Sequence, residues 1–396
     1  MQILDIVGDI DGKNILLLQG PMGNFFNILD HKFANLGAKT FRIGLNAGDE
    51  FFADAHHYTP FKGRIEEWER FIESFYKQHT IDMVFVFGDC RFYQSKAIEI
   101  AKKCGVRIFV FEEGYIRPDF ITLEENGVND NSSLPRERAF YEALEYHEEM
   151  ECHSKNVVHI GSTYGRMAWQ ATLYYIMGNL FSYKYPHYQH HRTFSALLEA
   201  FYGVRNFLRK YKYKVIEYKK EKLYTTTLSK KYYFVALQTH EDFQILHHSK
   251  YNNIEEFIEE VITSFAQNAP KDTFLVLKHH PMDRGKKDYA SFIKQKAAAL
   301  GVAQRVQAVY DLHLPTLLKN ALGTITINST VGISSLYHGT PTLCTGKSFY
   351  DIEGLTSKGL KLDDFWSDYT AVEQELFDKF RCYLIEKTQV NGSFYM

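Results

Sequence analysis

A chain of 396 residues is long enough for two domains, each with a core of its own. Its 45% hydrophobic and 15% aromatic residues exclude an intrinsically disordered protein, because a disordered chain lacks the apolar side chains that a packed core requires. The net charge of -2 gives the chain no overall positive field, so we expect no nucleic-acid partner.

The cysteines and the apolar stretches bear on where the protein works. The five cysteines lie far apart and form no Cys-x-x-Cys motif, which favours reduced thiols over a disulfide framework or a zinc site. The first residues lack the cationic start of a secretory signal. The most apolar stretch, 168–181, is shorter than the about 20 residues that span a bilayer. We therefore expect a cytoplasmic protein.

The first part of the chain alternates short apolar runs with helical patterns. The runs 15–20, 83–89 and 107–114 each end in Gly or Asp and are typical of buried parallel strands. Helical patterns cover 64–79 and 95–104. This alternation predicts a Rossmann-like α/β domain, to which we assign residues 1–155.

Polar residues follow the first two of these strands, at the sheet edge where ligands bind in doubly wound folds. After the first strand come Gln19, Gly20 and Gly23. The glycines would let a ligand anion approach the backbone closely, and the alternative is a plain tight turn. After the second strand come Asp89 and Arg91. We expect all five residues to contact substrate.

The third strand ends in a pair of carboxylates. Glu112 and Glu113 are adjacent, so their side chains should point to opposite faces, and at most one of them faces the ligand while the other supports it. Beside a cation such as Arg117, a carboxylate can act as a base or a nucleophile. The alternative is a solvated acidic turn.

Residues 156–229 differ in composition from the segments around them. The stretch from Lys155 to Lys231 holds 14 lysines and arginines against three glutamates, with tyrosines interleaved among them. We interpret the segment as helical and as facing an anionic membrane, through a cluster of cations from Arg209 to Lys222 and the rings of Tyr211, Tyr213 and Tyr218. A solvated helical linker is the alternative.

A second alternating series begins near Tyr232. Its predicted strands are 232–238, 273–281, 302–309, 324–330 and 340–346, and its predicted helices are 254–266, 289–300, 314–322 and 332–338. The pattern predicts a second Rossmann-like domain at residues 230–370. Residues 371–396 are predicted to form a helix that packs back toward the first domain.

The strand ends of this second series also carry polar residues. Gln238 ends the first strand, and Lys278 and His280 at the next strand end suit the oxygens of a nucleotide phosphate. Pro281 turns the chain there and exposes the imidazole. Adjacent histidines such as His279 and His280 rarely chelate one ion, so we expect no metal site.

A polar helix start follows the strand at 324–330. Its hydroxyls and backbone N–H groups could form an anion nest for a phosphate, and ordinary N-capping would explain part of the pattern. The residues concerned are Asn328, Ser329, Thr330, Ser334 and Ser335.

Motifs in order along nearly the whole chain carry a family resemblance. They are LLLQGPMGNFF, NAGDEFF, FGDCRFY, FEEGYIRPDFITLE, ALQTHEDFQ with HHS, KHHP and NSTVGISSLYHGTPT. In these motifs the chain resembles the capsule polysaccharide biosynthesis proteins of the KpsS/LipB type. It is more loosely similar to bacterial CMP-sialic-acid transferases of the GT-B architecture.

The resemblance implies a GT-B glycosyltransferase with two Rossmann-like domains facing a central cleft. The implied reaction moves β-Kdo, with retention, from CMP-β-Kdo to lysophosphatidylglycerol and so starts the poly-Kdo linker of a capsule. Glu113 would be the catalytic carboxylate, where related transferases often have Asp, and His280 with Pro281 would serve the CMP phosphate. Further phosphate contacts are implied for Ser329, Thr330, Ser334 and Ser335.

The resemblance also implies partners and a location. The partners are CMP-Kdo, lysophosphatidylglycerol at the anionic inner membrane surface, a companion poly-Kdo transferase and the capsule ABC exporter. No cofactor and no metal are implied, and the protein would associate peripherally with the inner membrane. Two other functions stay open: a non-catalytic lipid- or polysaccharide-binding subunit of the exporter, and a CMP-sialic-acid transferase.

Overall fold

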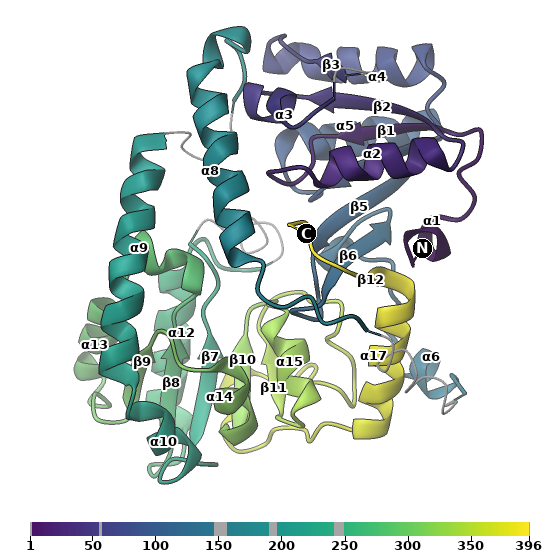
Figure 1. Ribbon diagram of the computed structural model, residues 1–396. Helices are drawn as coiled ribbons and strands as arrows, with labels where there is room; N and C mark the ends of the chain where they lie inside the picture. Colours follow the sequence, from purple (N-terminus) through teal and green to yellow (C-terminus); the bar gives the residue numbers. More distant parts are fainter. Residues whose placement is uncertain (1, 55–57, 146–156, 190–195, 241–248, 396) are drawn as a thin grey trace. The chain divides into compact units, whose positions relative to one another are not determined.

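Two compact α/β units make up the chain in a computed structural model (Figure 1). The structure describes residues 2–54, 58–145, 157–189, 196–240 and 249–395. The first unit comprises residues 1–133, 147–197 and 382–396, and the second comprises 134–146 and 198–381. Residues 241–248, which hold parts of the ALQTHEDFQ and HHS motifs, lie outside the described residues.

A seven-stranded sheet, counted over the described residues, is the centre of the first unit, in the order β12-β6-β5-β4-β1-β2-β3. Neighbouring strands are parallel except that β6 is antiparallel to both β5 and β12. The strands are β1 (Asn14–Leu18), β2 (Lys39–Gly44), β3 (Tyr58–Pro60), β4 (Met83–Phe87), β5 (Arg107–Glu113), β6 (Phe120–Glu125) and β12 (Gln389–Asn391).

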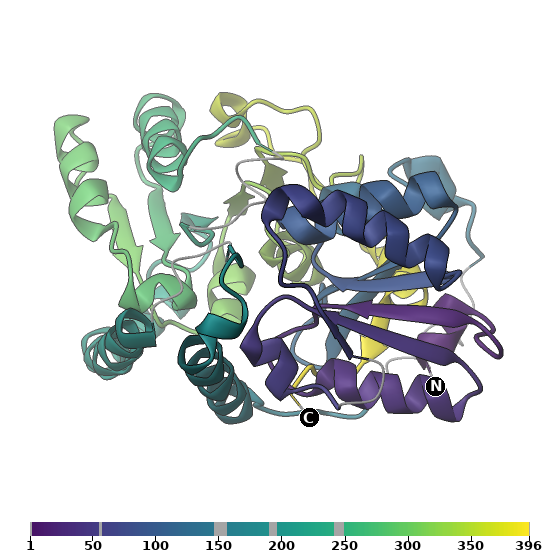
Figure 2. The ribbon, with the colours of Figure 1, turned by 90° about the horizontal axis from the view of Figure 1, so that it is seen from above.

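Helices cover both faces of this sheet, as Figure 2 shows for α2 on one face and α4 with α5 on the other. The strands are therefore apolar on both sides, and β1 buries Leu16 on the α4 face and Leu17 on the α2 face. The helices are α1 (Gln2–Val7), α2 (Phe25–Asn35), α3 (Ala47–Phe51), α4 (Trp68–Gln78), α5 (Phe92–Cys104) and α8 (Tyr164–Leu180). Helix α5 ends at Gly105, whose φ of 72° is the left-handed cap that glycine favours.

A five-stranded, fully parallel sheet, again counted over the described residues, is the centre of the second unit, in the order β11-β10-β7-β8-β9. Its strands are β7 (Tyr232–Ala236), β8 (Phe274–Lys278), β9 (Val306–Val309), β10 (Gly323–Thr326) and β11 (Thr342–Cys344). Its helices are α6 (Arg138–Glu142), α9 (Ala196–Glu217), α10 (Lys220–Thr225), α12 (Ile254–Asn268), α13 (Ala290–Ala299), α14 (Leu314–Asn320), α15 (Val331–Tyr337) and α16 (Leu362–Phe365).

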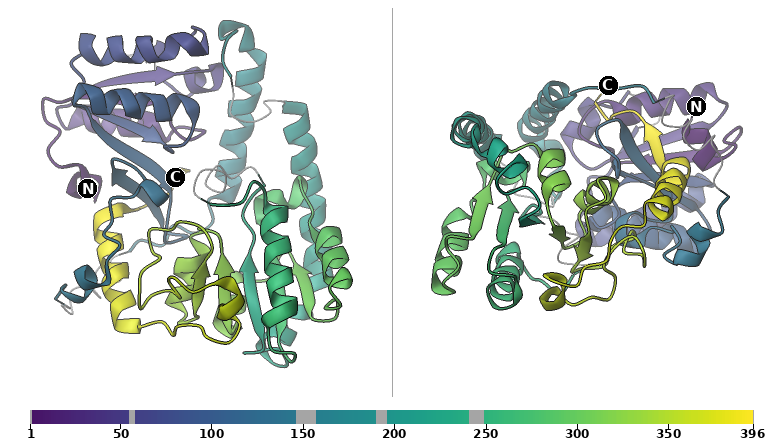
Figure 3. Two further views of the ribbon diagram at one scale, coloured as in Figure 1. Left: turned by 180° about the vertical axis from the view of Figure 1, so that it is seen from behind. Right: turned by 90° about the horizontal axis from the view of Figure 1, so that it is seen from below.

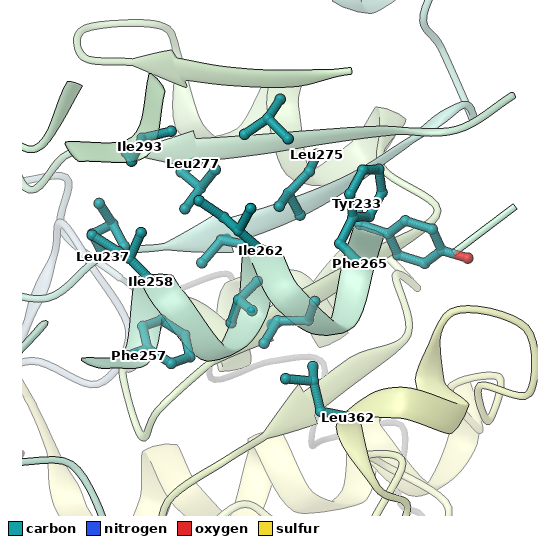
Figure 4. Close-up of a cluster of buried hydrophobic side chains, with 14 of the residues drawn as sticks. Tyr233, Leu237, Phe257, Ile258, Ile262, Phe265, Leu275, Leu277, Ile293 and Leu362 are labelled. Atoms are coloured by element: carbon teal, nitrogen blue, oxygen red, sulfur yellow. The ribbon is translucent and has the colours of Figure 1, made fainter. Parts of the chain in front are cut away.

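The core of the second unit forms where α12 packs on its sheet. Figure 4 shows Ile258 and Ile262 of α12 directed toward Leu277 of β8. The side chain of Asn253 caps the helix by accepting the N–H of Glu256 at 2.9 Å. Each such buried side chain contributes about 1.5–3 kcal/mol to the free energy of unfolding, so this face fixes the sheet that carries the strand-end residues.

The strand order reverses direction once in each sheet, and this reversal is the topological switch point of the unit. In the first sheet the chain proceeds from β1 outward to β2 and β3, and then returns to β4 on the other side of β1. In the second sheet it proceeds from β7 to β8 and β9, and then returns to β10 on the other side of β7. Ligands of open α/β sheets bind beyond the carboxyl ends of the strands at such points. The loops after β1, β4, β7 and β10 are therefore the positions of interest.

The α/β class with two parallel sheets is confirmed, whereas several elements were not predicted. Strands β2, β3, β6 and β12 are additions to the predicted set, and the C-terminal strand lies against β6 in Figure 3. The predicted helix in residues 371–396 is present as α17 (Gln374–Thr388), which leads into β12. No described helix combines the length and the hydropathy of a membrane span.

The predicted helical segment at 156–229 is divided between the two units. Residues 147–197 belong to the first unit and residues from 198 onward to the second. In the first unit, Tyr174 of α8 is buried and donates a hydrogen bond to Asp49 at 3.0 Å. In the second, Glu217 of α9 accepts the N–H of Asp311 at 2.8 Å. Buried polar contacts of this kind fix each helix to its own unit.

Candidate functional site

The residues of the loop after β1 contact other parts of the first unit. Gln19, 8% exposed, donates from Nε2 to Asp49 at 3.1 Å and accepts at Oε1 from Gln94 at 2.9 Å. A Cβ at Gly20 would lie 2.6 Å from the ring of Phe26, and one at Gly23 would collide with a glutamine side chain of α8. The side-chain amide of Gln19 is therefore used within the protein, and ligand contacts at Gln19, Gly20 and Gly23 stay predictions.

Asp89, which follows β4, accepts hydrogen bonds from a neighbouring turn. Its Oδ2 accepts the backbone N–H of Val128 at 3.1 Å and the side-chain amide of Asn131 at 3.0 Å, and its Oδ1 accepts the thiol of Cys90 at 3.2 Å. It is 8% exposed. Both oxygens of Asp89 thus accept hydrogen bonds within the first unit, and its substrate contact stays a prediction.

Arg91 and Glu112 lie together over a glycine at this sheet edge. Gly88 has a φ of 72°, and a Cβ built there would lie 3.8 Å from Glu112 Oε2 and 3.9 Å from Arg91 Nε. The guanidinium of Arg91 also lies 5.1 Å from the ring centre of Phe87. A carboxylate and a cation are therefore adjacent beyond the end of β4.

Strand alternation places the two glutamates of β5 on opposite faces, as expected. Glu112 is half-buried, and Glu113 is exposed on the face that carries Phe111 and Tyr395. Glu112 Oε1 accepts the backbone N–H of Glu113 at 3.0 Å. Arg117 is exposed, and its Nε donates to the Gly114 carbonyl at 3.1 Å. The exposed carboxylate of Glu113 is thus the one presented outward.

Burial raises the pKa of Glu112 to about 7, with the negative charges of Glu113 and Asp89 adding to the effect and Arg91 opposing it. The folded state holds a proton between pH 4.5 and 7 that the unfolded chain has released, so stability falls as pH rises through this window. Glu112→Gln should therefore stabilise the protein at pH 8 more than at pH 5.5, by about 1–2 kcal/mol of unfolding free energy. Urea unfolding at the two pH values measures the difference.

The matched control for this measurement is Glu73→Gln. Glu73 is an exposed carboxylate whose pKa is lowered by a hydrogen bond from Lys77, so its removal should give no gain in stability at the higher pH. An equal gain in both variants would contradict the burial of charge at Glu112.

Glu124 is a buried carboxylate that the sequence did not single out. It accepts hydrogen bonds from Tyr115 at 2.6 Å and from Ser132, and burial raises its pKa to about 7. It becomes buried because β6 pairs with β5, which sets it opposite Val110. No local signal in FITLEE distinguishes it from its half-buried neighbour, Glu125.

Gln238 and Asn328 meet at the switch point of the second unit. Gln238 Nε2 donates to Asn328 Oδ1 at 3.0 Å, and the Asn328 backbone N–H donates to Gln238 Oε1 at 3.3 Å. The structure thus brings together two predicted residues from distant parts of the chain. The pair links the loops after β7 and β10 at the edge where ligands bind in this fold.

The loop after β8 directs two adjacent histidines differently. The ring of His279 is 3% exposed and stacks on Tyr310 at 4.5 Å between ring centres, and burial lowers its pKa to about 4. His280 is half-buried, and its Nδ1 accepts the N–H of Met282 at 3.3 Å. Pro281 begins the short 3₁₀ turn 281–285, as its restricted φ favours.

Lys278 is used partly inside the fold. It is 8% exposed, and its Nζ donates to the Tyr310 carbonyl at 2.8 Å. Burial lowers the pKa of Lys278 to about 8, and the carboxylates of Asp311 and Glu217 oppose this effect. Its ammonium group therefore lies below the surface that His280 presents.

The hydroxyls around α15 have separate roles. Ser329 Oγ accepts the N–H of Val331 at 3.2 Å, which is part of the helix start that capping would explain. Ser335 is fully buried and bonds Thr324 Oγ1 at 2.7 Å, so it is a core residue and the expected phosphate contact at Ser335 is wrong. Thr330 and Ser334 are partly exposed near the same edge.

His240 and Asp283 form a further pair at this edge. Asp283 Oδ1 lies 2.7 Å from His240 Nδ1, and its Oδ2 accepts the His240 backbone N–H at 2.9 Å. The pair holds the loop after β7 to the turn after His280. The sequence could have indicated His240, because it belongs to the ALQTHEDFQ motif, whereas no sequence pattern indicates Asp283.

Over the described ranges, no three histidine, cysteine or acidic side chains converge as metal ligands.

Comparison with known proteins gives consistent matches. The model of the family "Capsule polysaccharide biosynthesis protein" matches residues 82–395. The capsule polysaccharide export protein KpsS of Escherichia coli is 40% identical, with 98% of each chain covered. The capsule polysaccharide modification protein LipB of Neisseria meningitidis serogroup B is 38% identical, over 97% of this chain and 92% of LipB.

Among solved structures, the KpsC beta Kdo 2,7 transferase of Thermosulfurimonas dismutans matches with a TM-score of 0.43 and 16% identity. The match covers 93% of this chain and 89% of that chain.

Proposed function

The chain belongs to the capsule polysaccharide biosynthesis protein family, and on this premise we propose that it is a glycosyltransferase that moves Kdo from CMP-β-Kdo to lysophosphatidylglycerol. The observation that carries the proposal is the strand end of β5. There, Glu113 presents an exposed carboxylate, while Glu112 and Arg91 lie together beside it over Gly88.

The first unit supplies the carboxylate for the sugar. As the bond between Kdo C2 and the CMP phosphate breaks, the electron pair leaves with CMP and positive charge develops at C2. Glu113 attacks C2 and holds the sugar as an ester. An acceptor hydroxyl then attacks C2, the bond between C2 and Glu113 breaks with its electron pair returning to the carboxylate, and the hydroxyl proton passes to that carboxylate or to water. The two inversions give net retention. Glu112 supports this strand end by accepting the N–H of Glu113. The exposed guanidinium of Arg117 suits the carboxylate of Kdo.

The second unit supplies the contacts for CMP. Because His280 Nδ1 accepts the Met282 N–H, the neutral imidazole carries its proton on Nε2, which can donate to a phosphate oxygen. The hydrogen bond strengthens as the phosphate gains charge on leaving. Asn328, Ser329, Thr330 and Ser334 lie at the same sheet edge and complete the proposed phosphate contacts.

The test is a donor and acceptor assay with the full chain. Purified protein is incubated with CMP-β-Kdo and a short-chain lysophosphatidylglycerol, with CMP-sialic acid as the matched donor, and CMP release and product mass are followed. We expect transfer from CMP-Kdo and none from CMP-sialic acid. A non-catalytic binding subunit would give neither hydrolysis nor transfer, and a CMP-sialic-acid transferase would reverse the donor preference.

Chelation provides a separate prediction. Transfer should change by less than about twofold in EDTA, because His280 and helix-start N–H groups can stabilise the leaving phosphate without a divalent ion. Initial rates with and without EDTA, followed by addition of Mg²⁺ or Mn²⁺, measure this. A rate lost on chelation and restored by the ion would assign a metal to the site and overturn this part of the proposal.

A further inference from the structure

The outward face of α9 carries a continuous apolar stripe. Its side chains follow one another at spacings of three and four residues, which places them on one side of a helix. Each is between 58% and 80% exposed. They are Phe201, Val204, Leu208, Tyr211 and Val215, with Tyr218 just beyond the helix end. Six large apolar side chains aligned in solvent are more than the single exposed residues that are normal on a surface.

Lysines border this stripe on both sides. At 100° per residue, Lys212 lies on one flank of the stripe and Lys214 lies on the other, and both are exposed. Lys219 adds a further exposed cation beyond the helix end. Glu217, one of two acidic residues in α9, is buried on the opposite side. The outward face is therefore apolar in the middle and cationic at its edges.

The opposite face of α9 is fixed to the second unit. Tyr213 stacks on Tyr310 with 3.8 Å between ring centres, and Arg209 donates to the Arg284 carbonyl at 2.8 Å. Glu217 accepts the backbone N–H groups of Tyr310 and Asp311 at 3.0 and 2.8 Å. Figure 1 shows α9 alongside β8 and β9 accordingly. Tyr213 and Arg209 thus face inward, which corrects their place in the expected membrane-facing cluster.

These inward contacts connect the helix to the loop that carries His280. Arg284 belongs to the 3₁₀ turn that begins at Pro281, and its guanidinium bonds Asn206 of α9 at 3.2 Å and Asp311. A surface that holds the outward face of α9 therefore also fixes the orientation of this loop.

We propose that the outward face of α9 docks on an anionic lipid bilayer and orients the His280 loop relative to the membrane surface. A bilayer suits this face, because an apolar stripe flanked by lysines can bury its side chains at the acyl boundary while the ammonium groups reach the anionic headgroups. The charge of the face is complementary to such lipids. This inference rests on the proposed function, since a lipid acceptor gives the docked loop its substrate.

The test uses co-sedimentation of the full chain with vesicles of phosphatidylcholine alone and with 30% phosphatidylglycerol, a composition of about one anionic lipid in three. One variant replaces Lys212, Lys214 and Lys219 with Glu. A second replaces Val204, Leu208 and Val215 with Gln. The matched control replaces the exposed Lys271, Lys294 and Lys319 of the same unit with Glu. Circular dichroism and thermal unfolding establish that each variant is folded.

We expect the parent to bind the anionic vesicles and to bind them less tightly as salt rises, because screening acts over a Debye length of about 8 Å. The lysine variant should lose more than about tenfold in affinity at low salt, since three attractive contacts become repulsive. The stripe variant should lose the binding that persists in high salt. The control should stay within about twofold of the parent.

Three outcomes would overturn the inference. In the first, the parent protein does not bind anionic vesicles. In the second, the lysine variant or the stripe variant binds these vesicles as tightly as the parent does. In the third, sedimentation velocity shows that the parent is a dimer and that the stripe variant is a monomer, which would make the stripe a dimer interface. Transfer to a soluble short-chain acceptor separates this inference from the proposed function. If the protein transfers Kdo but does not bind vesicles, only the docking inference is wrong. If it binds vesicles but does not transfer Kdo, only the proposed glycosyltransferase function is wrong.

Discussion

Replacing Glu113 with glutamine is expected to lower the rate of Kdo transfer by about 10³-fold or more. Glutamine keeps the shape of the side chain but removes the charge that attacks C2 of the sugar. The affinity for CMP should change by less than about threefold, because the proposed contacts of CMP lie in the second unit. Steady-state product formation and isothermal titration with CMP measure the two quantities.

Glu112→Gln is the matched variant one residue away. Its side chain lies on the other face of β5 and supports the strand end, so its loss of activity should be smaller, about tenfold. Glu113→Asp should keep measurable activity, since the shorter carboxylate retains the charge. If Glu113→Gln is fully active, Glu113 is not the catalytic carboxylate. If Glu112→Gln is the inactive variant of the two, the roles of Glu112 and Glu113 are reversed.

His280→Ala is expected to weaken CMP binding and to slow transfer together, by about 10²-fold in kcat/KM. The phosphate is present in both the ground state and the transition state, but it carries more charge as it leaves, so both quantities respond. Titration with CMP and initial rates over a range of CMP-Kdo concentrations provide the measurement.

His313→Ala is the control for the loss of an imidazole in the same unit. His313 is exposed at the start of α14, where its ring contacts Thr316. Both CMP affinity and rate should stay near those of the parent. If His280→Ala also behaves like the parent, His280 has no place in the CMP site and the second unit must bind the phosphate through other groups.

The apolar strands were predictable because their signal is local. Parallel strands covered on both faces read as unbroken apolar runs, and β4, β5, β7 and β8 all follow predicted runs closely. The short edge strand β12 has no such run. It forms because β6, more than 260 residues earlier in the chain, offers an unpaired edge.

The candidate site was predictable to the level of the strand ends but not of each side chain. The sequence placed polar residues after β1, β4, β5, β8 and β10, where the fold does present them. It did not show that Gln19 and Asp89 already use their polar atoms within the first unit. An amide or carboxylate has the same chemistry whether its partner is a ligand or another part of the chain, so only the packed structure distinguishes the two.

The sequence by itself determined the family, the two-sheet α/β class and the opposite faces of Glu112 and Glu113, because each follows from motif order or from a period of two along a strand. Only the tertiary structure decided which histidine is presented and which is buried: Tyr310 covers His279 and leaves His280 at the surface. It also decided which face of α9 points outward. The period of the helix allows either face to be buried, and contacts of Tyr213 and Glu217 with the residues after β9 select the inner one, since buried rings and charges require partners that lie close in space and far apart in sequence.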